Sequence, residues 1–424
     1  MNLFFELLQV AIGNRQSLYR VASPEEWEEI YEMSKKQAVA GIAFAGVERL
    51  PQEQMPPGRR IRQWAVKAEK TREHNAKVSE DCRVISRFFE ENGFDCVILK
   101  GQGNFAYYPE WLQGLRSAGD IDVWALPKSK IDGNGNVNVN PLNSGTIEPL
   151  NFMNHPVRSV IEFCLSKKRG EYVYYHNLDF PVLKKTPVEV HYRPTWLYNP
   201  FRNRVLQKWF GQFTVHNSQF TVHNSRLASV APAVRPITQF AVYDGYRIPS
   251  VEFNVVFQLL HLYKHIFEEG IGLRQLLDYY FVVKKFNETL RYEDEMQSEI
   301  ATKRGYATTI TKLGLWKFAG AVMYVMREVF AMPEEMMLCK PDRKRGRKLL
   351  NEIMQGGNFG KFDARYNWAE TTNGSMDYRG VSYAFARLRH NFQFLSDYPS
   401  EVLWEPLFRV YHWFWRRCRL WRWE

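Results

Sequence analysis

The sequence predicts an α+β protein in which a short run of β-strands lies between two helical regions. Hydrophobic residues follow a helical spacing over most of the first 94 residues, form extended runs up to about residue 192, and return to a helical spacing from residue 248. Of the 424 residues, 45% are hydrophobic and 15% aromatic, which is enough for a packed core and for two or three domains. The expected regions are an N-terminal helical region (1–94), an α/β core (95–230) and a C-terminal helical domain (231–424).

Helix signals dominate the N-terminal region. Ser23 is suited to cap a helix, because a proline follows it and Glu26 completes a capping box. Two further helices are expected over residues 42–50 and 59–92, and Gly93 is suited to end the second of them. We expect these helices to support the sheet.

The first strand signal leads to a pair of aspartates. An apolar run at 96–99 ends at Lys100, and a glycine-containing stretch then leads to Asp120 and Asp122. In an extended strand these two carboxylates point to the same side, while the residues between and after them point into a core. Two adjacent carboxylates repel each other unless a cation lies between them, and hard oxygen ligands suit Mg²⁺. An isolated Asp-x-Asp is also common at solvated strand ends, so the pattern alone leaves both interpretations open.

A third carboxylate follows later in the chain. Beyond an Asn- and Gly-rich stretch that predicts a surface loop (128–146), the sequence predicts a helix at 148–168 and extended runs at 172–176, 178–183 and 187–192. In the last run Val188 and Val190 share one face, and Glu189 and His191 share the other. Spacing alone does not decide whether Glu189 lies beside the aspartate pair.

A heptapeptide, QFTVHNS, occurs twice in succession over residues 212–225. Seven residues are too few for a solenoid repeat. Because seven is odd, a copy within a strand would exchange its inward and outward faces, so we expect a turn, bulge or hairpin extension to absorb it.

The C-terminal region contains polar residues with more than one interpretation. His261 and His265 lie four residues apart on one expected helix face, a spacing that suits zinc, packing or phosphate binding. Asp278 lies among apolar residues, where a carboxylate is either paired with a base or functional.

The last expected helix, within 404–423, combines aromatic and basic residues. Either it lies on a membrane or partner surface, or it packs on the core with its arginines in solvent. The aromatic stripe consists of Trp404, Phe408, Tyr411, Trp415 and Cys418, and the basic stripe of Arg409, Arg416 and Arg419.

The net charge favours anionic partners. The chain has 57 Lys and Arg against 46 Asp and Glu, a formal charge of +11, which suits nucleotides, nucleic acid or an anionic membrane. Its five cysteines form no CxxC pair, so neither a zinc ribbon nor a disulfide framework is indicated, and a reducing cytoplasm fits. We expect no signal peptide and no transmembrane helix, because Glu6 interrupts the first apolar run and no run reaches eighteen apolar residues.

Several of these motifs together resemble a known family. Their order is similar to that of the uncharacterised nucleotidyltransferase family, within the DNA polymerase beta-like superfamily, over about residues 20–340. The resemblance implies a small mixed β-sheet nucleotidyltransferase core flanked by helical regions. The motifs are Leu99-Lys100-Gly101, Tyr108-Pro109, Arg116, Gly119-Asp120-Ile121-Asp122-Val123, Tyr175-His176 and Val188-Glu189-Val190-His191-Tyr192, with His261-Leu262-Tyr263-Lys264-His265 and Leu276-Leu277-Asp278 further along.

The resemblance also implies roles for individual residues. Asp120, Asp122 and Glu189 would be the catalytic carboxylates and the ligands of Mg²⁺ or Mn²⁺. The protein would transfer a nucleoside monophosphate from an NTP to a hydroxyl on a protein, an RNA, a sugar or a small molecule. The NTP phosphates would contact Lys100, Gly101, Gln102, Gly103 and Arg116, and the substrate would contact His176 and His191.

The chain departs from the superfamily pattern in its glycine turn. That pattern has Gly followed by Gly or Ser with the aspartates soon after, whereas Gln102 follows Gly101 here and seventeen residues separate it from Asp120. Two other classes of function remain open. One is a nucleotide- or nucleic-acid-binding module without turnover, and the other is a peripheral partner in the assembly of a surface polysaccharide or peptide product.

Overall fold

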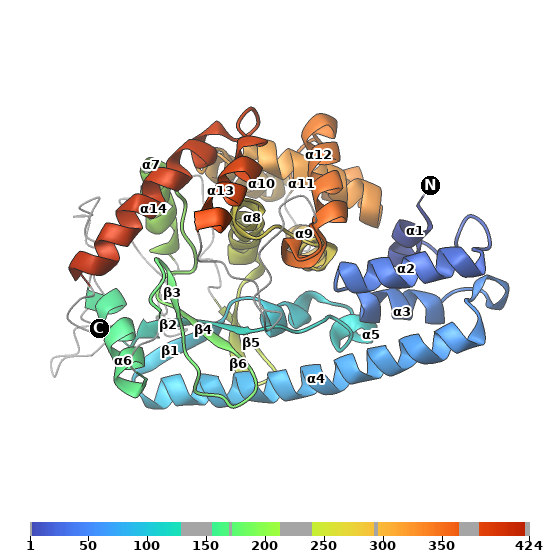
Figure 1. The fold of residues 1–424 in the computed structure, drawn as a ribbon, viewed down its shortest axis with the longest axis horizontal. Coiled ribbons are helices and arrows are strands. Elements are labelled where there is room, and N and C mark those ends of the chain that lie inside the picture. Colours follow the sequence, from blue (N-terminus) through green and yellow to red (C-terminus); the bar gives the residue numbers. More distant parts are fainter. Residues whose placement is uncertain are drawn as a thin grey trace.

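The computed structural model describes residues 2–128, 155–168, 172–212, 240–291, 296–363 and 381–419. Most of the predicted 128–146 loop and of the 212–225 duplication lies outside these residues. A small sheet lies near one end of the long helix α4, the N-terminal helices lie near the other end, and the C-terminal helices cover the remaining side (Figure 1). This arrangement confirms the predicted α+β fold, with a small mixed sheet and flanking helices.

Three of the four N-terminal helices begin within two residues of the predicted positions, and the first helix was not predicted. The four are α1 (Leu3–Ala11), α2 (Pro24–Lys36), α3 (Ala40–Glu48) and α4 (Gly58–Glu91). The capping box is confirmed, because the Ser23 hydroxyl accepts from the Glu26 amide at 3.3 Å and the Glu26 carboxylate accepts from the Ser23 amide at 2.9 Å. Gly93 ends α4 with a positive φ of 85°, which a residue with a side chain rarely adopts.

The sheet has four strands in the order β1-β2-β4-β3. Strands β2 and β4 run parallel, while β1 and β3 pair antiparallel to them on the two edges. The strands are β1 (Phe94–Ile98), β2 (Ile121–Pro127), β3 (Asn177–Asp179) and β4 (Val188–His191).

Two of the expected strands differ from the structure. The run at 172–176 contributes only an isolated bridge between Val173 and Leu178, because the chain turns back there and the Tyr174 amide donates to the Asn177 carbonyl. The run at 178–183 forms a strand only over Asn177–Asp179. The tyrosines of residues 172–176 therefore gave the pattern of a strand, although the chain forms a tight turn there.

Both faces of the sheet are covered. One face packs Cys96, Val123 and Val190 against α4 and α6 (His155–Lys167). The opposite face packs Val97 and Trp124 against the larger helical core. Asp122 is two residues before Trp124 in β2 and therefore faces the helical core.

An additional hairpin precedes the C-terminal helices. Strands β5 (Phe240–Tyr243) and β6 (Tyr246–Pro249) pair antiparallel around Asp244 and Gly245, which both have positive φ. Asp-Gly is a common hairpin turn, but this hairpin was not among the expected strands.

Helices form the rest of the described chain. None of them is long and apolar enough to cross a membrane. The short helices are α5 (Glu110–Gln113) and α7 (Pro200–Phe210), and the C-terminal ones are α8 (Val251–Glu268), α9 (Leu273–Arg291), α10 (Met296–Lys312), α11 (Trp316–Phe330), α12 (Arg343–Gly356), α13 (Val381–Phe392) and α14 (Pro399–Arg419).

Candidate active site

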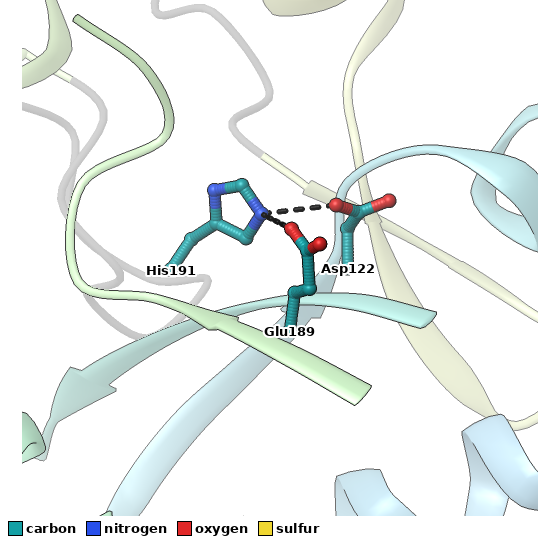
Figure 2. Close-up of side chains that lie close together, drawn as sticks. All are labelled: Asp122, Glu189 and His191. Carbon is teal, nitrogen blue, oxygen red and sulfur yellow. Dashed lines mark hydrogen bonds and ion pairs between the residues drawn. The ribbon is translucent and has the colours of Figure 1, made fainter. Parts of the chain in front are cut away.

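The parallel pairing of β2 with β4 brings distant polar residues together. Asp122 lies opposite Glu189, and His191 follows two residues later on the same face. The His191 Nε2 atom is 2.9 Å from Asp122 Oδ1 and 3.7 Å from Glu189 Oε2 (Figure 2). One ligand atom from each of these residues lies within 4.8 Å of the other two, so together they could hold a metal ion. We call Asp122, Glu189 and His191 the acidic cluster.

Asp120 lies immediately before β2 and lines the same pocket as Asp122. Burial, followed by the negative charge of Asp122, raises the pKa of Asp120. The same two causes, burial and the nearby aspartates, raise the pKa of Glu189 well above its usual value. A cation at this position would relieve both effects.

Lys100 provides the first positive charge beside the acidic cluster. Its Nζ lies 2.9 Å from Asp122 Oδ1. Although burial alone would raise it, the pKa of Asp122 lies below its usual range, because Lys100 and the hydrogen bond with His191 favour the carboxylate. Lys100, predicted to contact phosphate, therefore forms an ion pair with a carboxylate.

The glycine turn is a 3₁₀ helix at Gly101–Tyr107. Gly101 has a positive φ of 58° and lines the pocket, and a Cβ on Gly103 would lie only 2.5 Å from the Ile98 carbonyl oxygen. The Gln102 side chain is buried and donates to Asn75 Oδ1 in α4 at 3.1 Å. Gln102 thus uses its side chain to attach the turn to α4.

Arg116 forms a buried ion pair with Asp278. Its Nε and Nη2 atoms each lie 2.7 Å from one oxygen of the Asp278 carboxylate, and the Tyr108 hydroxyl donates to the same group at 2.7 Å. For Asp278, the structure therefore supports pairing with a base. It leaves Arg116 in the pocket wall with its charge largely balanced.

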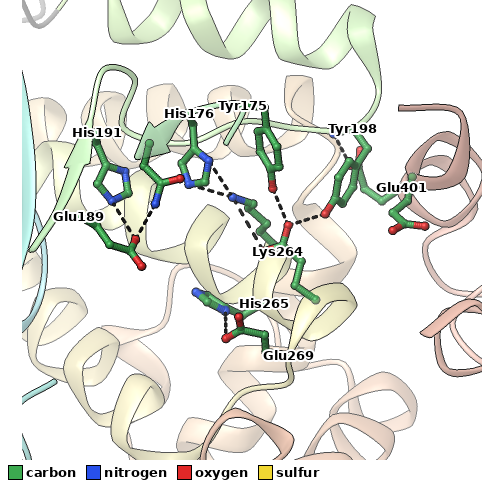
Figure 3. A network of polar contacts seen from close by, with 12 residues as sticks. Tyr175, His176, Glu189, His191, Tyr198, Lys264, His265, Glu269 and Glu401 are labelled. Atoms are coloured by element: carbon green, nitrogen blue, oxygen red, sulfur yellow. Dashed lines mark hydrogen bonds and ion pairs between the residues drawn. The ribbon is translucent and has the colours of Figure 1, made fainter. Parts of the chain in front are cut away.

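His176 links the acidic cluster to a second polar network (Figure 3). Its ring centroid lies 5.1 Å from that of His191, and its Nε2 lies 3.0 Å from Lys264 Nζ. Burial lowers the pKa of Lys264 to about 8. On its other side Lys264 lies 3.9 Å from Glu268, which accepts from the Tyr175 hydroxyl at 2.5 Å.

The two histidines of α8 contact each other. The ring centroids of His261 and His265 are 4.2 Å apart, and burial lowers the pKa of both, that of His265 to about 3. His261 lines the pocket, but within the described parts of the chain the acidic cluster is the one group with metal-ligand spacing.

The pocket beside Asp120 and Asp122 has about 500 Å³ of empty volume, partly open to solvent. Sequence reasoning missed several wall residues, because they come from elements whose packing it does not specify. The lining residues are Lys100, Gly101, Asn104, Arg116, Gly119, Asp120, Asp122, Gln258, His261, Leu262, Arg274, Gln275, Asp278 and Phe359.

The predicted aromatic stripe of α14 is mainly its packed side. Phe408 and Trp415 are buried, whereas Cys418 is exposed. A second apolar stripe faces outward and consists of Leu403, Leu407, Val410, Trp413 and Phe414. The packed-helix interpretation therefore holds for one side of α14 only.

Comparison with known proteins places the chain in a family. A model of the family described as uncharacterised nucleotidyltransferase matches residues 23–301, a segment that includes the acidic cluster. No match was found among curated proteins or solved structures. Because the matched segment is more than half of the chain, the protein belongs to the uncharacterised nucleotidyltransferase family.

Proposed function

We propose that this protein transfers a nucleoside monophosphate from an NTP to a hydroxyl acceptor, and that its core is of the DNA polymerase beta-like type. The observation that carries the proposal is the register of Asp122 with Glu189 on adjacent parallel strands, beside a pocket that Asp120 lines. The match to the nucleotidyltransferase family supports the reaction class. Lys100 and the glycine turn, which line this pocket or adjoin it, are proposed to contact the nucleotide phosphates.

The residues fit a divalent cation. Asp120, Asp122 and Glu189 offer the carboxylate oxygens that Mg²⁺ and Mn²⁺ prefer. His191 Nδ1 lies 3.2 Å from the Pro194 carbonyl oxygen, while Nε2 faces Asp122. Without a cation, Nε2–H donates to Asp122. With a cation in the cluster, a neutral imidazole that donates from Nδ1 to the Pro194 carbonyl would offer its Nε2 lone pair to the cation, as metal-binding histidines do. When bound, the cation offsets phosphate charge and lowers the pKa of an acceptor hydroxyl.

In the proposed reaction Glu189 acts as the general base. Burial, and then the charges of Asp120 and Asp122, raise the pKa of Glu189 well above its usual value, which favours proton uptake by this carboxylate. Asn177 Nδ2 donates to Glu189 Oε2 at 2.6 Å and orients the carboxylate. Glu189 takes the hydroxyl proton, the acceptor oxygen bonds to the α-phosphorus, and the bond to the β-phosphate breaks to release pyrophosphate.

A labelling assay tests this function. The protein is incubated with Mg²⁺ or Mn²⁺ and each α-labelled NTP, alone and with cell extract, and label transfer is measured. The double variant Asp120→Ala, Asp122→Ala is expected to lose transfer. Equal labelling by both proteins would contradict the metal-dependent mechanism.

The alternative is a nucleotide- or nucleic-acid-binding module without turnover, which the net charge of +11 favours. It predicts no transfer, and binding that survives when Asp120 and Asp122 are neutralised. The labelling assay combined with a binding assay on the double variant separates the two functions.

We also propose that α14 contacts an anionic membrane surface. Its outward apolar stripe is accompanied by exposed Arg409 and Arg417, while its two acidic residues in the described chain, Glu401 and Glu405, are buried. A helix that exposes apolar and basic groups without exposed acidic ones suits the interface of an anionic bilayer.

A further inference from the structure

Two arginines line the pocket, and they differ in how their charge is balanced. Arg116 is held by both oxygens of Asp278. Arg274, in the first turn of α9, is only 8% exposed, and its Nη1 donates to the Ser117 carbonyl at 2.9 Å. Burial and the charge of Arg116 lower the pKa of Arg274 to about 10, although Asp278 and Asp120 lie near enough to oppose this. Its Nε is buried without a hydrogen-bond partner among the described residues. A buried guanidinium in this state favours an added anion.

The next residue has an unused donor as well. Gln275 is 6% exposed, and its Oε1 accepts from the Gly272 amide at 3.0 Å. Its Nε2, among the described residues, is buried without a partner. Since the Leu273 amide already donates to Gln37, the donors left for a ligand in this turn include the Arg274 and Gln275 side chains. The N-terminal end of the 19-residue helix α9 also favours negative charge.

The Phe359 ring packs against the Arg274 guanidinium but carries no charge that could neutralise it. The guanidinium carbon of Arg274 lies 5.2 Å from the centroid of the Phe359 ring, which also lines the pocket. A ring face stabilises a cation and restricts its orientation, but it supplies no counter-charge. Arg274 is therefore kept in the pocket wall with a donor available.

We propose that Arg274 and Gln275 bind the β- and γ-phosphates of the NTP in this pocket. The identity of the ligand as a nucleotide rests on the proposed function. A planar guanidinium with an adjacent amide donor suits phosphate oxygens, which accept several hydrogen bonds. Arg274 and Gln275 line the same pocket as Asp120 and Lys100, so phosphates bound at α9 would share that pocket with the acidic residues.

Isothermal titration calorimetry on the full chain tests this site. The ligands are ATP, inorganic tripolyphosphate and adenosine, each measured with wild type, Arg274→Gln and Arg327→Gln. Arg327 is a surface arginine on α11 that pairs with Glu328, so its variant has the same loss of charge away from the pocket. Arg274→Gln is expected to weaken ATP and tripolyphosphate binding roughly 10- to 100-fold and to leave adenosine binding unchanged. Arg327→Gln is expected to bind like wild type.

Two further variants guard against misfolding as an explanation. Arg274→Lys keeps the charge but loses the planar fork, and an intermediate affinity for tripolyphosphate is expected. Gln275→Glu keeps the acceptor for the Gly272 amide and replaces the free donor with a carboxylate oxygen, which repels phosphate. Thermal unfolding of each variant shows whether it is folded.

The outcomes separate this site from the proposed reaction. If label transfer occurs but Arg274→Gln binds ATP and tripolyphosphate as tightly as wild type, the phosphate site is overturned and the reaction stands. If tripolyphosphate binding depends on Arg274 but no transfer is found, the site stands and the reaction fails. If folded wild-type protein binds neither ATP nor tripolyphosphate, the site is overturned whatever the labelling assay gives.

Discussion

Asp122 and Glu189 lie directly opposite each other on the parallel strands β2 and β4. Asp122 is 3% exposed, whereas the Glu189 side chain is 32% exposed. The ionised Asp122 is held by Lys100. Glu189 is more accessible than Asp122 but still mostly enclosed, and this burial together with the two aspartates raises its pKa. The difference in environment suits two roles, a permanent metal ligand and a proton acceptor.

Asp122→Asn should reduce nucleotidyl transfer by about 10²- to 10³-fold, because it removes a negative charge at the centre of the acidic cluster. The measurement is the rate of label transfer at saturating NTP and metal. Asp244→Asn is the matched control, since Asp244 lies in the β5–β6 turn and pairs with Arg83 at the surface. A similar loss in both variants would point to a general effect of the substitution.

His191 should be a direct ligand of bound Mn²⁺. Electron spin-echo spectroscopy of the Mn²⁺-loaded protein is expected to show coupling to an imidazole nitrogen, because Nε2 faces Asp122 and Glu189. The coupling should vanish in His191→Gln and persist in His261→Gln, which changes a histidine of the same pocket outside the acidic cluster. A signal that is equal in both variants would rule out His191 as the ligand.

The sequence predicted the faces of the strands better than their partners. Alternation along β2 and β4 correctly assigned the common side of Asp120 and Asp122 and that of Glu189 and His191, because side-chain direction is a local property. The parallel contact between these strands depends on the packing of the whole chain. The position of Arg274 in the pocket wall also could not be predicted from the sequence, because it depends on how α9 packs against the turn before β2.

Metal affinity should decrease as the pH falls. The decrease should begin at a higher pH than it would for carboxylates with ordinary pKa values. Burial is the first cause of the raised pKa values of Asp120 and Glu189. Protons therefore compete with the cation in a pH range above the usual pKa values of these carboxylates. Without metal, a raised folded-state pKa means that stability falls as pH rises through that window, and Mg²⁺ should restore it there. Thermal unfolding with and without Mg²⁺ from pH 4.5 to 8 measures both effects. Glu189→Gln should flatten the pH dependence, and an unchanged slope would contradict this assignment.

The outward stripe of α14 should bind anionic liposomes. In flotation assays the wild type is expected to bind vesicles that contain phosphatidylserine and not vesicles of phosphatidylcholine alone, with binding that weakens in high salt. Leu407→Glu with Phe414→Glu should abolish binding, because both side chains are exposed and apolar. The control is Val242→Glu, which alters an exposed apolar residue on the β5–β6 hairpin. Flotation that is unaffected by the α14 variant would exclude this helix as the membrane contact.

Two buried glutamates, one turn apart in α14, should have opposite effects on stability when each is replaced by glutamine. Glu401 is 2% exposed, accepts from the Tyr198 amide at 2.9 Å through Oε2, and has a buried Oε1 without a partner among the described residues. Burial raises its pKa to about 7. Glu405 instead pairs with Arg387 at 3.2 Å and with Arg409.

Because the pKa of Glu401 is higher in the folded than in the unfolded chain, stability should fall as pH rises from about 4.5 to about 7. Glu401→Gln keeps an acceptor for the Tyr198 amide and cannot ionise, so at pH 8 it should be more stable than wild type by ~1–3 kcal/mol, with a smaller difference at pH 5. Glu405→Gln should be less stable than wild type at both pH values, because it removes the carboxylate charge that pairs with the buried Arg387. Urea denaturation at pH 5 and pH 8 measures these differences, and a Glu401→Gln variant that is less stable than wild type at pH 8 would show that the ionised carboxylate is stabilised in the fold.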